Sequence, residues 1–380
     1  MSDQTGPADA GPQPAAQGQP DPSEGARPAQ TAEGQSEAGP GGGAPPADEH
    51  TRVEAAATEA QPQRRLTILG GAGEARSLGL VVVLLLLGVV GAVTAPASFL
   101  TMSNLLNILT TASVIGVVTV GMTFVIIGGG IDLSVGAIIA LASVWSTTLA
   151  TQAFGLGGML FSALVVGTCA GLVNGILISY GRLVPFIVTL AMLVSARGLA
   201  EQISDRRSQI VEVRSFADIA LTRVLGVPML VYVLAAVCVV GWLVLNRTTF
   251  GRRTFAIGGN LEAARLAGID VKRHTMLLYV LSGLCCGIAA VMLTAQTNTG
   301  ASTHGQLYEL DAIAAVIIGG TLLTGGRGSL VGSVLGVLVF TTITNLFILN
   351  NLSTPIQNIA KGAIIVAAVL LQLRSREARA

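Results

Sequence analysis

Glycines and a carboxylate interrupt an otherwise apolar run between Gly121 and Ser143. The interruption consists of Gly128, Gly129, Gly130, Asp132 and Ser134. Non-helical backbone and an ionised carboxylate are costly in hydrocarbon, so such a segment persists only inside protein, beside water or at a membrane edge. Either Asp132 caps the next helix by accepting from its first free N–H groups, or the glycines, Asp132 and Ser134 form a hinge or gate on a transport route.

Four further polar side chains lie within apolar segments: Asn174, Gln296, Asn345 and Lys361. The three amides are suited to binding the hydroxyl groups of a solute, and equally suited to hydrogen bonds between helices. Lys361 either reaches the headgroup region, forms an ion pair, or lines a pathway. Arg197, near the outer end of its span, is interpreted as a marker of the membrane interface.

The sequence offers no catalytic group or metal site. It contains no GxxxxGK[ST] loop for binding nucleotide phosphates. The four cysteines, at positions 169, 238, 285 and 286, lack metal-ligand spacing and are expected to be small core hydrophobes. We therefore do not expect the chain itself to be an enzyme, and we expect no metal and no cofactor bound to it.

The composition indicates an integral membrane protein. Hydrophobic residues make up 51% of the chain and charged residues only 11%, whereas an average soluble domain has about 25% charged residues. Residues 1–65 differ from the rest, because they are rich in Pro, Gly, Ala and acidic residues and lack large apolar side chains. We expect an all-α membrane domain over residues 66–380 and a disordered acidic tail over residues 1–65.

About ten apolar segments are long enough to cross roughly 30 Å of hydrocarbon. The third begins at the Gly-Asp interruption, and the eighth is short and broken by Gly319 and Gly320. The expected spans cover residues 78–95, 105–128, 133–152, 158–180, 183–201, 227–245, 276–296, 309–324, 329–349 and 354–373.

Basic residues place both termini in the cytoplasm. Short cytoplasmic loops carry an excess of Lys and Arg, and with ten spans the loops with such an excess all fall on one side. That side includes residues 64–76, the loop at 246–275 and the C-terminal arginines. The longer outer loop at 202–226 balances four basic groups against three acidic ones. The Gly-Asp interruption is then expected at the cytoplasmic end of the second span.

The loop at 246–275 is expected to contact another protein. Within it, Asn260 can cap a short helix that contains Glu262, Ala263, Ala264 and Arg265 and is closed by Gly268. So short a helix is unstable in isolation, so it must pack on something, and a cytoplasmic partner is the obvious candidate.

The pattern Glu262-Ala263-Ala264 with Gly268 resembles the ATPase-coupling EAA loop of ATP-binding-cassette importer permeases. The longer segments GMTFVIIGGGIDLSVGA, AIGGNLEAARLAGIDV and IAAVIIGGTLLTGGRGS resemble the ribose/xylose type of sugar permease, within the branched-chain amino acid/sugar permease superfamily. The similarity runs from about Phe99 to Leu373. The general permease pattern continues to Ile-x-Leu-Pro, whereas this chain reads Leu278-Tyr279-Val280-Leu281, which argues against other importer subfamilies.

This resemblance implies a type II importer-like permease that works as a homodimer in the bacterial plasma membrane. A cytoplasmic ATPase would bind ATP and Mg²⁺, and an extracytoplasmic sugar-binding protein would deliver a monosaccharide. The alternative is an ion-coupled secondary transporter. It would need ionisable groups at the bilayer midplane, and its candidates, Asp132, Lys361 and the pair Glu309/Asp311, are expected towards span ends.

Overall fold

The computed structural model describes the backbone of residues 71–377 and the side chains of residues 77–370. The predicted acidic tail at 1–65 lies outside these residues. The described chain is almost entirely helical, which confirms the all-α prediction. Its longer helices are α2 (Gly71–Thr94), α4 (Met102–Ile127), α7 (Gly155–Ser179), α8 (Pro185–Ser204), α10 (Met229–Arg247), α13 (Val271–Thr297), α15 (Leu330–Leu349) and α16 (Thr354–Glu377).

Shorter elements connect these helices. They are α3 (Pro96–Phe99), α5 (Val135–Ser146), α6 (Leu149–Gln152), α9 (Arg214–Leu221), α11 (Thr249–Gly259), α12 (Leu261–Leu266) and α14 (Tyr308–Ile318). Two antiparallel strand pairs complete the described chain: β1 (Gln209–Ile210) with β4 (Thr299–Gly300), and β2 (Arg223–Val224) with β3 (Val227–Pro228).

Within the described residues, seven helices are long and apolar enough to cross a membrane, namely α2, α4, α7, α8, α10, α13 and α15. The shorter apolar helices are α5 and the Thr354–Leu370 part of α16. With 12 and 11 residues, α5 and α14 extend only about 18 and 16 Å. The third and eighth expected spans, at 133–152 and 309–324, therefore contain helices too short to cross about 30 Å of hydrocarbon, and the total of ten spans stays a prediction.

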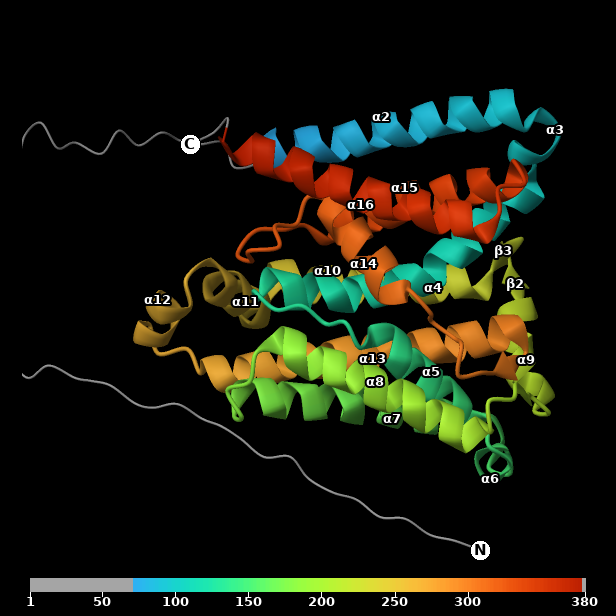
Figure 1. Cartoon of the computed structure of the whole chain (residues 1–380), viewed down its shortest axis with the longest axis horizontal. Helices are drawn as coiled ribbons and strands as arrows, with labels where there is room; N and C mark the ends of the chain where they lie inside the picture. Colours follow the sequence, from blue (N-terminus) through green and yellow to red (C-terminus); the bar gives the residue numbers. More distant parts are fainter. Residues whose placement is uncertain (1–70, 378–380) are drawn as a thin grey trace, which may run out of the picture. The chain divides into compact units, whose positions relative to one another are not determined.

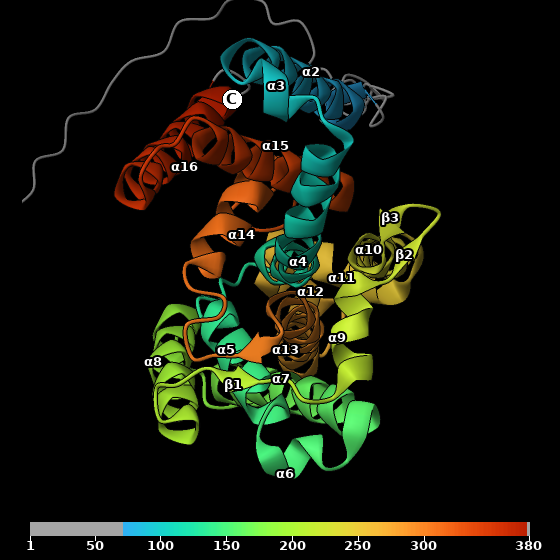
Figure 2. The same ribbon diagram turned by 90° about the vertical axis from the view of Figure 1, so that its right-hand side faces the viewer.

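The helices form a stack with two unequal sides. From one end of the stack to the other, Figure 2 shows α2, α15, α4, α13 and α7 in succession. On one side lie α5, α8, α14 and α16, and on the other lies α10. Figure 1 shows α11 and α12 at one end of the helices and α6, α9 and the strands at the opposite end. We call these the α12 end and the α9 end.

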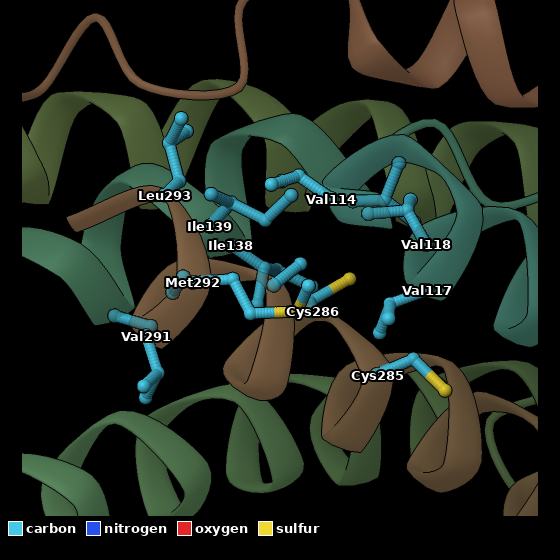
Figure 3. Close-up of a cluster of buried hydrophobic side chains, with 14 of the residues drawn as sticks. Val114, Val117, Val118, Ile138, Ile139, Cys285, Cys286, Val291, Met292 and Leu293 are labelled. Carbon is cyan, nitrogen blue, oxygen red and sulfur yellow. The ribbon is translucent and has the colours of Figure 1, made fainter. Parts of the chain in front are cut away.

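The main hydrophobic core joins α4, α5 and α13. Figure 3 shows it: Val114, Val117 and Val118 of α4 and Ile138 and Ile139 of α5 surround Cys285 and Cys286 of α13. These two cysteines are buried as predicted, whereas Cys238 is only half-buried and Cys169 is exposed on α7, contrary to prediction. Thiols are small enough to be accommodated on either face of a helix.

Glycines bring α7 and α13 into backbone contact. A Cβ atom on Gly167 or Gly171 would collide with the backbone of α13, and one on Gly283 or Gly287 would meet the backbone of α7. Small residues four apart allow this approach in membrane helices, where dispersion and backbone contacts replace the hydrophobic effect as the attraction between helices. The high glycine content therefore has a packing function here.

Candidate functional site: a docking helix and two half-helices

The short helix α12 is fixed at its start by Asn260. The Asn260 Oδ1 atom accepts from the N–H of Ala263 at 2.9 Å, and the Asn260 backbone is extended, as an N-cap requires. This confirms the cap predicted from the sequence. Because α12 has only six residues, this bond organises much of its first turn.

Gly268 closes α12 in a left-handed conformation with φ +78°. Its N–H donates to the Arg265 carbonyl at 3.0 Å, and the Ile269 N–H donates to the Ala264 carbonyl at 3.1 Å. These two hydrogen bonds together form a Schellman motif. Its left-handed position favours glycine, because other residues meet steric strain there. The predicted helix end at Gly268 is confirmed.

The surface of α12 is almost entirely exposed. Only Ala264 is buried among its residues, while Glu262, Ala263 and Arg265 are exposed and the Leu266 side chain is 88% exposed. The ion pairs in the described part of the chain do not include Glu262 with Arg265. The exposed Leu266, next to the unpaired charges of Glu262 and Arg265, gives α12 a surface suited to binding another protein.

Glycines connect the α11–α12 segment to the end of α4. Gly258, at the end of α11, has no room for a side chain, because a Cβ atom there would overlap the Ile127 carbonyl at the last residue of α4. The same carbonyl accepts from the N–H of Gly326 at 2.8 Å. A Cβ atom on Gly325 would lie 2.9 Å from the Gly129 Cα atom. We call this meeting of three chain segments the glycine junction.

The predicted hinge glycines lie at this junction. Gly129 has φ +84°, so it reverses the chain after α4 in a conformation that glycine adopts without strain. Gly128 packs on Leu278, and a Cβ atom on Gly130 would lie 2.5 Å from the Tyr279 hydroxyl oxygen. These contacts give each glycine a packing reason, and the hinge role stays a prediction. A cavity of about 270 Å³ lies beside all three.

Asp132 lies deeper than the sequence indicated. Its Oδ2 atom accepts from the Ser282 hydroxyl at 2.8 Å, and Ser282 is eleven residues from the start of the 27-residue helix α13. The glycines of the interruption directly follow α4, as expected, but Asp132 does not lie at that end, because the chain turns back at Gly129 and runs inward along α13. Charge counting assigns loops to sides, but it cannot detect a segment that re-enters the bundle.

Hydrogen bonds satisfy the buried Asp132 carboxylate. Its Oδ1 atom accepts from the Ser134 N–H at 3.0 Å and the Ser134 hydroxyl at 2.5 Å. The N-cap of α5 is Ser134, so Asp132 forms the turn just before the helix rather than the cap itself. The Asn174 amide of α7 donates to the Ser134 hydroxyl at 2.9 Å, which fixes this turn to a third helix.

The two half-helices begin at the same place. Gly136, in the first turn of α5, leaves no room for a Cβ atom beside the Gly305 carbonyl and the Glu309 carboxylate, which precede and begin α14. Both helices therefore direct their N-terminal ends, which carry partial positive charge, towards one point. Discontinuous helices that meet in this way are characteristic of transporters, where irregular backbone lines a cavity or is buried in protein.

Asn345 forms a reciprocal amide pair. Its Nδ2 atom donates to Asn104 Oδ1 at 2.8 Å, and Asn104 Nδ2 donates to Asn345 Oδ1 at 3.1 Å. The pair joins α4 to α15 and is buried. The contacts of Asn345 and Asn174 thus correspond to the interhelical alternative, while Gln296 is exposed near the end of α13. The pathway-lining role of the three amides stays a prediction.

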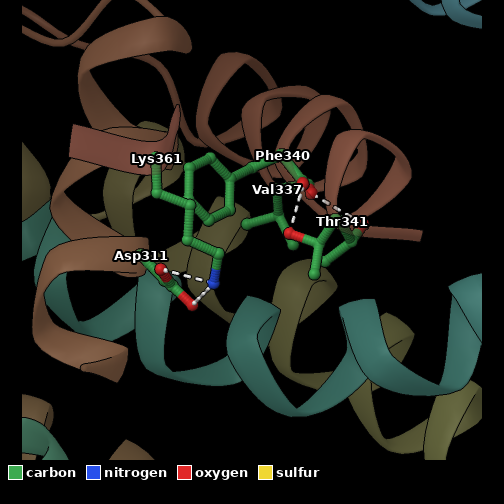
Figure 4. A network of polar contacts seen from close by, with 6 residues as sticks. Asp311, Val337, Phe340, Thr341 and Lys361 are labelled. Atoms are coloured by element: carbon green, nitrogen blue, oxygen red, sulfur yellow. Dashed lines mark hydrogen bonds and ion pairs between the residues drawn. The ribbon is translucent and has the colours of Figure 1, made fainter. Parts of the chain in front are cut away.

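Lys361 forms an ion pair inside the helix bundle. Its Nζ atom lies 3.1 Å from Asp311 Oδ2 and 3.3 Å from Oδ1, and 5.2 Å from the centre of the Phe340 ring (Figure 4). Asp311 is in the first turn of α14, so the pair fixes this half-helix to α16. Of the alternatives for Lys361, the ion pair is the one observed.

Arg197 has a role that the sequence did not indicate. Its Nη1 atom donates to the carbonyl of Ser302 and, at 2.8 Å, to that of His304. It therefore holds the non-helical chain that leads into α14 rather than marking an interface. The polar run ASTHGQ at 301–306, directly before an apolar segment, was the available signal.

Comparison with known proteins identifies the family. Residues 104–369 match the model of the branched-chain amino acid transport system / permease component family. The ribose import permease protein RbsC of Bacillus subtilis (strain 168) is 39% identical over 305 residues, covering 79% of this chain and 93% of that protein. RbsC of Escherichia coli (strain K12) is 36% identical over 296 residues, covering 77% and 92%.

A permease named for another sugar is similarly related. The L-arabinose transport system permease protein AraH of Escherichia coli (strain K12) is 36% identical over 309 residues, covering 79% of this chain and 92% of that protein. No solved structure matches the chain. The match over most of the membrane domain, together with relatives covered almost end to end, shows that this chain belongs to the branched-chain amino acid transport system / permease component family.

Proposed function

We propose that this protein is the membrane-spanning subunit of an ATP-driven importer for a monosaccharide of the ribose or xylose kind. Two copies form the transport pathway in the bacterial plasma membrane. A separate cytoplasmic ATPase binds and hydrolyses ATP with Mg²⁺, and an extracytoplasmic binding protein delivers the sugar. The names of the relatives support the substrate class.

The exposed helix α12 is the observation that carries this proposal. It is capped at both ends, anchored through Ala264, and leaves Glu262, Arg265 and Leu266 free to contact a partner. Such a helix is too short to persist without its caps and contacts, so its fixed form suits rigid docking. On this proposal the α12 end is cytoplasmic, which agrees with the basic residues of the loop at 246–275, and we expect both termini to be cytoplasmic as well.

The glycine junction offers a route from docking to the pathway. Displacement of α12 moves α11, whose Gly258 lies on the Ile127 carbonyl and close to Gly326. That carbonyl ends α4, directly before the segment leading to α5, and Gly326 lies in the loop after α14. A single displacement of α12 and α11 would therefore act on both α5 and α14. ATP binding would change the population of inward-facing and outward-facing states through its different affinity for each.

Reconstitution tests the proposed function. The chain is purified with the ATPase and binding protein encoded beside it and placed in lipid vesicles, and ATP hydrolysis and uptake are measured with a panel of pentoses and hexoses. We expect at least one sugar to stimulate hydrolysis and to enter the vesicles only when ATP is present. Uptake driven by an ion gradient without ATP would favour the secondary-transporter alternative.

Substitution of Gly268 tests the docking assignment. Gly268→Leu places a bulky side chain beside α12, and Gly226→Leu is a matched control. Both glycines have positive φ, +78° and +81°, and neither has a neighbour within 4 Å of a built Cβ atom, but Gly226 lies at the α9 end. We expect Gly268→Leu to abolish sugar-stimulated ATP hydrolysis and Gly226→Leu to retain it. Equal coupling in the two variants would contradict the docking assignment.

A further inference from the structure

The chain that leads into α14 descends along α5 into the bundle. Gly300 lies against Ser143 and Thr147 at the end of α5, whereas Gly305 lies against Gly136 in its first turn. Gly136 is eleven residues from Thr147, the α5 C-cap, which corresponds to about 16 Å along the helix. Since the hydrocarbon core is about 30 Å thick, Gly305 lies near its middle if the end of α5 marks the boundary.

This descending segment is held rigidly. Arg197 of α8 binds the carbonyls of Ser302 and His304, and the His304 Nδ1 atom is hydrogen-bonded to the Ser143 hydroxyl of α5 at 2.8 Å. The Ser143 hydroxyl also accepts from Thr294 of α13 at 2.9 Å. Three helices therefore fix one stretch of non-helical chain, which is the arrangement expected of a pre-formed binding element.

Two polar side chains of this segment form no hydrogen bond within the described chain. Thr303 and Gln306 are exposed, and neither side chain has a hydrogen-bond partner in the part of the chain that the structure describes. Their neighbours Ser302 and Gly305 are buried. Figure 2 shows this chain, drawn in orange before α14, on the side of the stack that carries α8 and α16.

An exposed amide at this depth does not face lipid. An unsatisfied amide or hydroxyl transferred into hydrocarbon costs several kcal/mol, about 4 to 8. Non-helical backbone at membrane depth is likewise tolerated only where it is buried or lines a water-filled cavity. We therefore expect the space next to Gln306, on the side of the stack between α8 and α16, to be filled with water.

We propose that Gln306 and Thr303 line the sugar pathway and hydrogen-bond sugar hydroxyls, with Thr303 nearer the α9 end and Gln306 near the midplane. The inference rests on the proposed function and adds the side chains that meet the substrate. A primary amide both donates and accepts, and so does a hydroxyl, which suits sugar hydroxyls. The apolar Leu310 is exposed in the first turn of α14, four residues after Gln306, and is suited to the less polar face of the sugar ring.

Cysteine labelling tests the location without requiring transport. The exposed Cys169 and half-buried Cys238 are first replaced by alanine. Gln306→Cys and Thr303→Cys are then compared with Ser302→Cys, a buried neighbour, and with Val89→Cys, which is 61% exposed on the apolar helix α2. A charged, membrane-impermeant methanethiosulfonate is added to vesicles that contain the full complex.

We expect Gln306→Cys to react at least tenfold faster than both controls, and sugar-loaded binding protein to slow that reaction. Thr303→Cys should behave in the same way. A rate for Gln306→Cys equal to that of Val89→Cys would mean that the position faces lipid, and this would overturn the proposal whether or not the complex imports sugar.

Uptake by Gln306→Leu and Thr303→Val tests the chemistry. Each removes hydrogen-bonding atoms at similar volume, and the loss of one hydrogen bond to the substrate corresponds to about a tenfold change. We expect about tenfold slower sugar uptake by each variant. Normal uptake by both variants, in a complex whose unsubstituted form imports sugar, would refute the inference and leave the proposed function intact.

Discussion

The two half-helices solve the same physical problem in different ways. Each follows non-helical chain that enters the bundle, α5 from the α12 end and α14 from the α9 end. In the segment before α5, hydrogen bonds link the side chains of Asp132, Ser134, Ser282 and Asn174, and the Asp132 carboxylate is buried. Before α14, Thr303 and Gln306 remain exposed and unpaired within the described chain.

This difference distinguishes polar groups that support the fold from polar groups that can contact a solute. The segment before α5 is a buried polar network, in which the Asn174 Oδ1 atom alone lacks a hydrogen-bond partner within the described chain. The segment before α14 is held on one side by Arg197 and exposes Thr303 and Gln306 on the other. A break in a membrane helix is therefore insufficient to locate a pathway. The side chains that the fold leaves unpaired are the more informative feature.

The largest effect on stability is expected from breaking the ion pair between Lys361 and Asp311, which holds α14 against α16. Lys361→Ala leaves the Asp311 carboxylate buried without its partner, which typically costs about 3 to 5 kcal/mol. We expect a strongly lowered melting temperature in detergent. The double variant Asp311→Asn with Lys361→Met removes both charges and should recover most of the loss. Failure of the double variant to recover would show that the pair has a function beyond its mutual compensation.

A smaller effect is expected where the two half-helices meet. Gly136→Val forces a side chain against the Gly305 carbonyl, and overpacking of this kind costs about 1 to 3 kcal/mol. Gly198→Val on α8 is the control, because a Cβ atom there has no neighbour within 4 Å. Thermal unfolding of both variants gives the comparison. Equal stability would contradict the close approach of α5 to α14.

The smallest effect on stability is expected for Asp132→Asn. The amide retains one oxygen that can accept from Ser134 or Ser282, so we expect a loss of about 1 kcal/mol, the worth of one hydrogen bond. Sugar uptake then separates the two interpretations of Asp132. A stable variant with normal uptake supports a structural turn, whereas a stable but inactive variant supports the moving joint.

Local patterns were sufficient where the structure depends on neighbouring residues. The ends of α12 were predictable from Asn260 and Gly268, because capping depends on residues three to five positions apart. The apolar segments of α4, α7, α8, α10, α13 and α15 were likewise predictable, because crossing the hydrocarbon requires a minimum apolar length. The helical class followed from the same requirement.

Contacts between distant segments were not predictable in this way. Asp132 was expected at a membrane surface, but its partner Ser282 is 150 residues away. Lys361 could not be assigned to Asp311, nor Asn345 to Asn104, since each pair joins helices that the sequence does not place side by side.

The sequence by itself determined that this is a helical membrane protein with a capped, exposed loop helix, because hydrophobic length and helix capping act along the chain. Only the tertiary structure decided which polar groups are paired inside the bundle and which remain unpaired beside α14. The physical reason is that a polar side chain in a membrane protein acquires its role from the partner it meets, and that partner is set by the packing of helices distant in sequence.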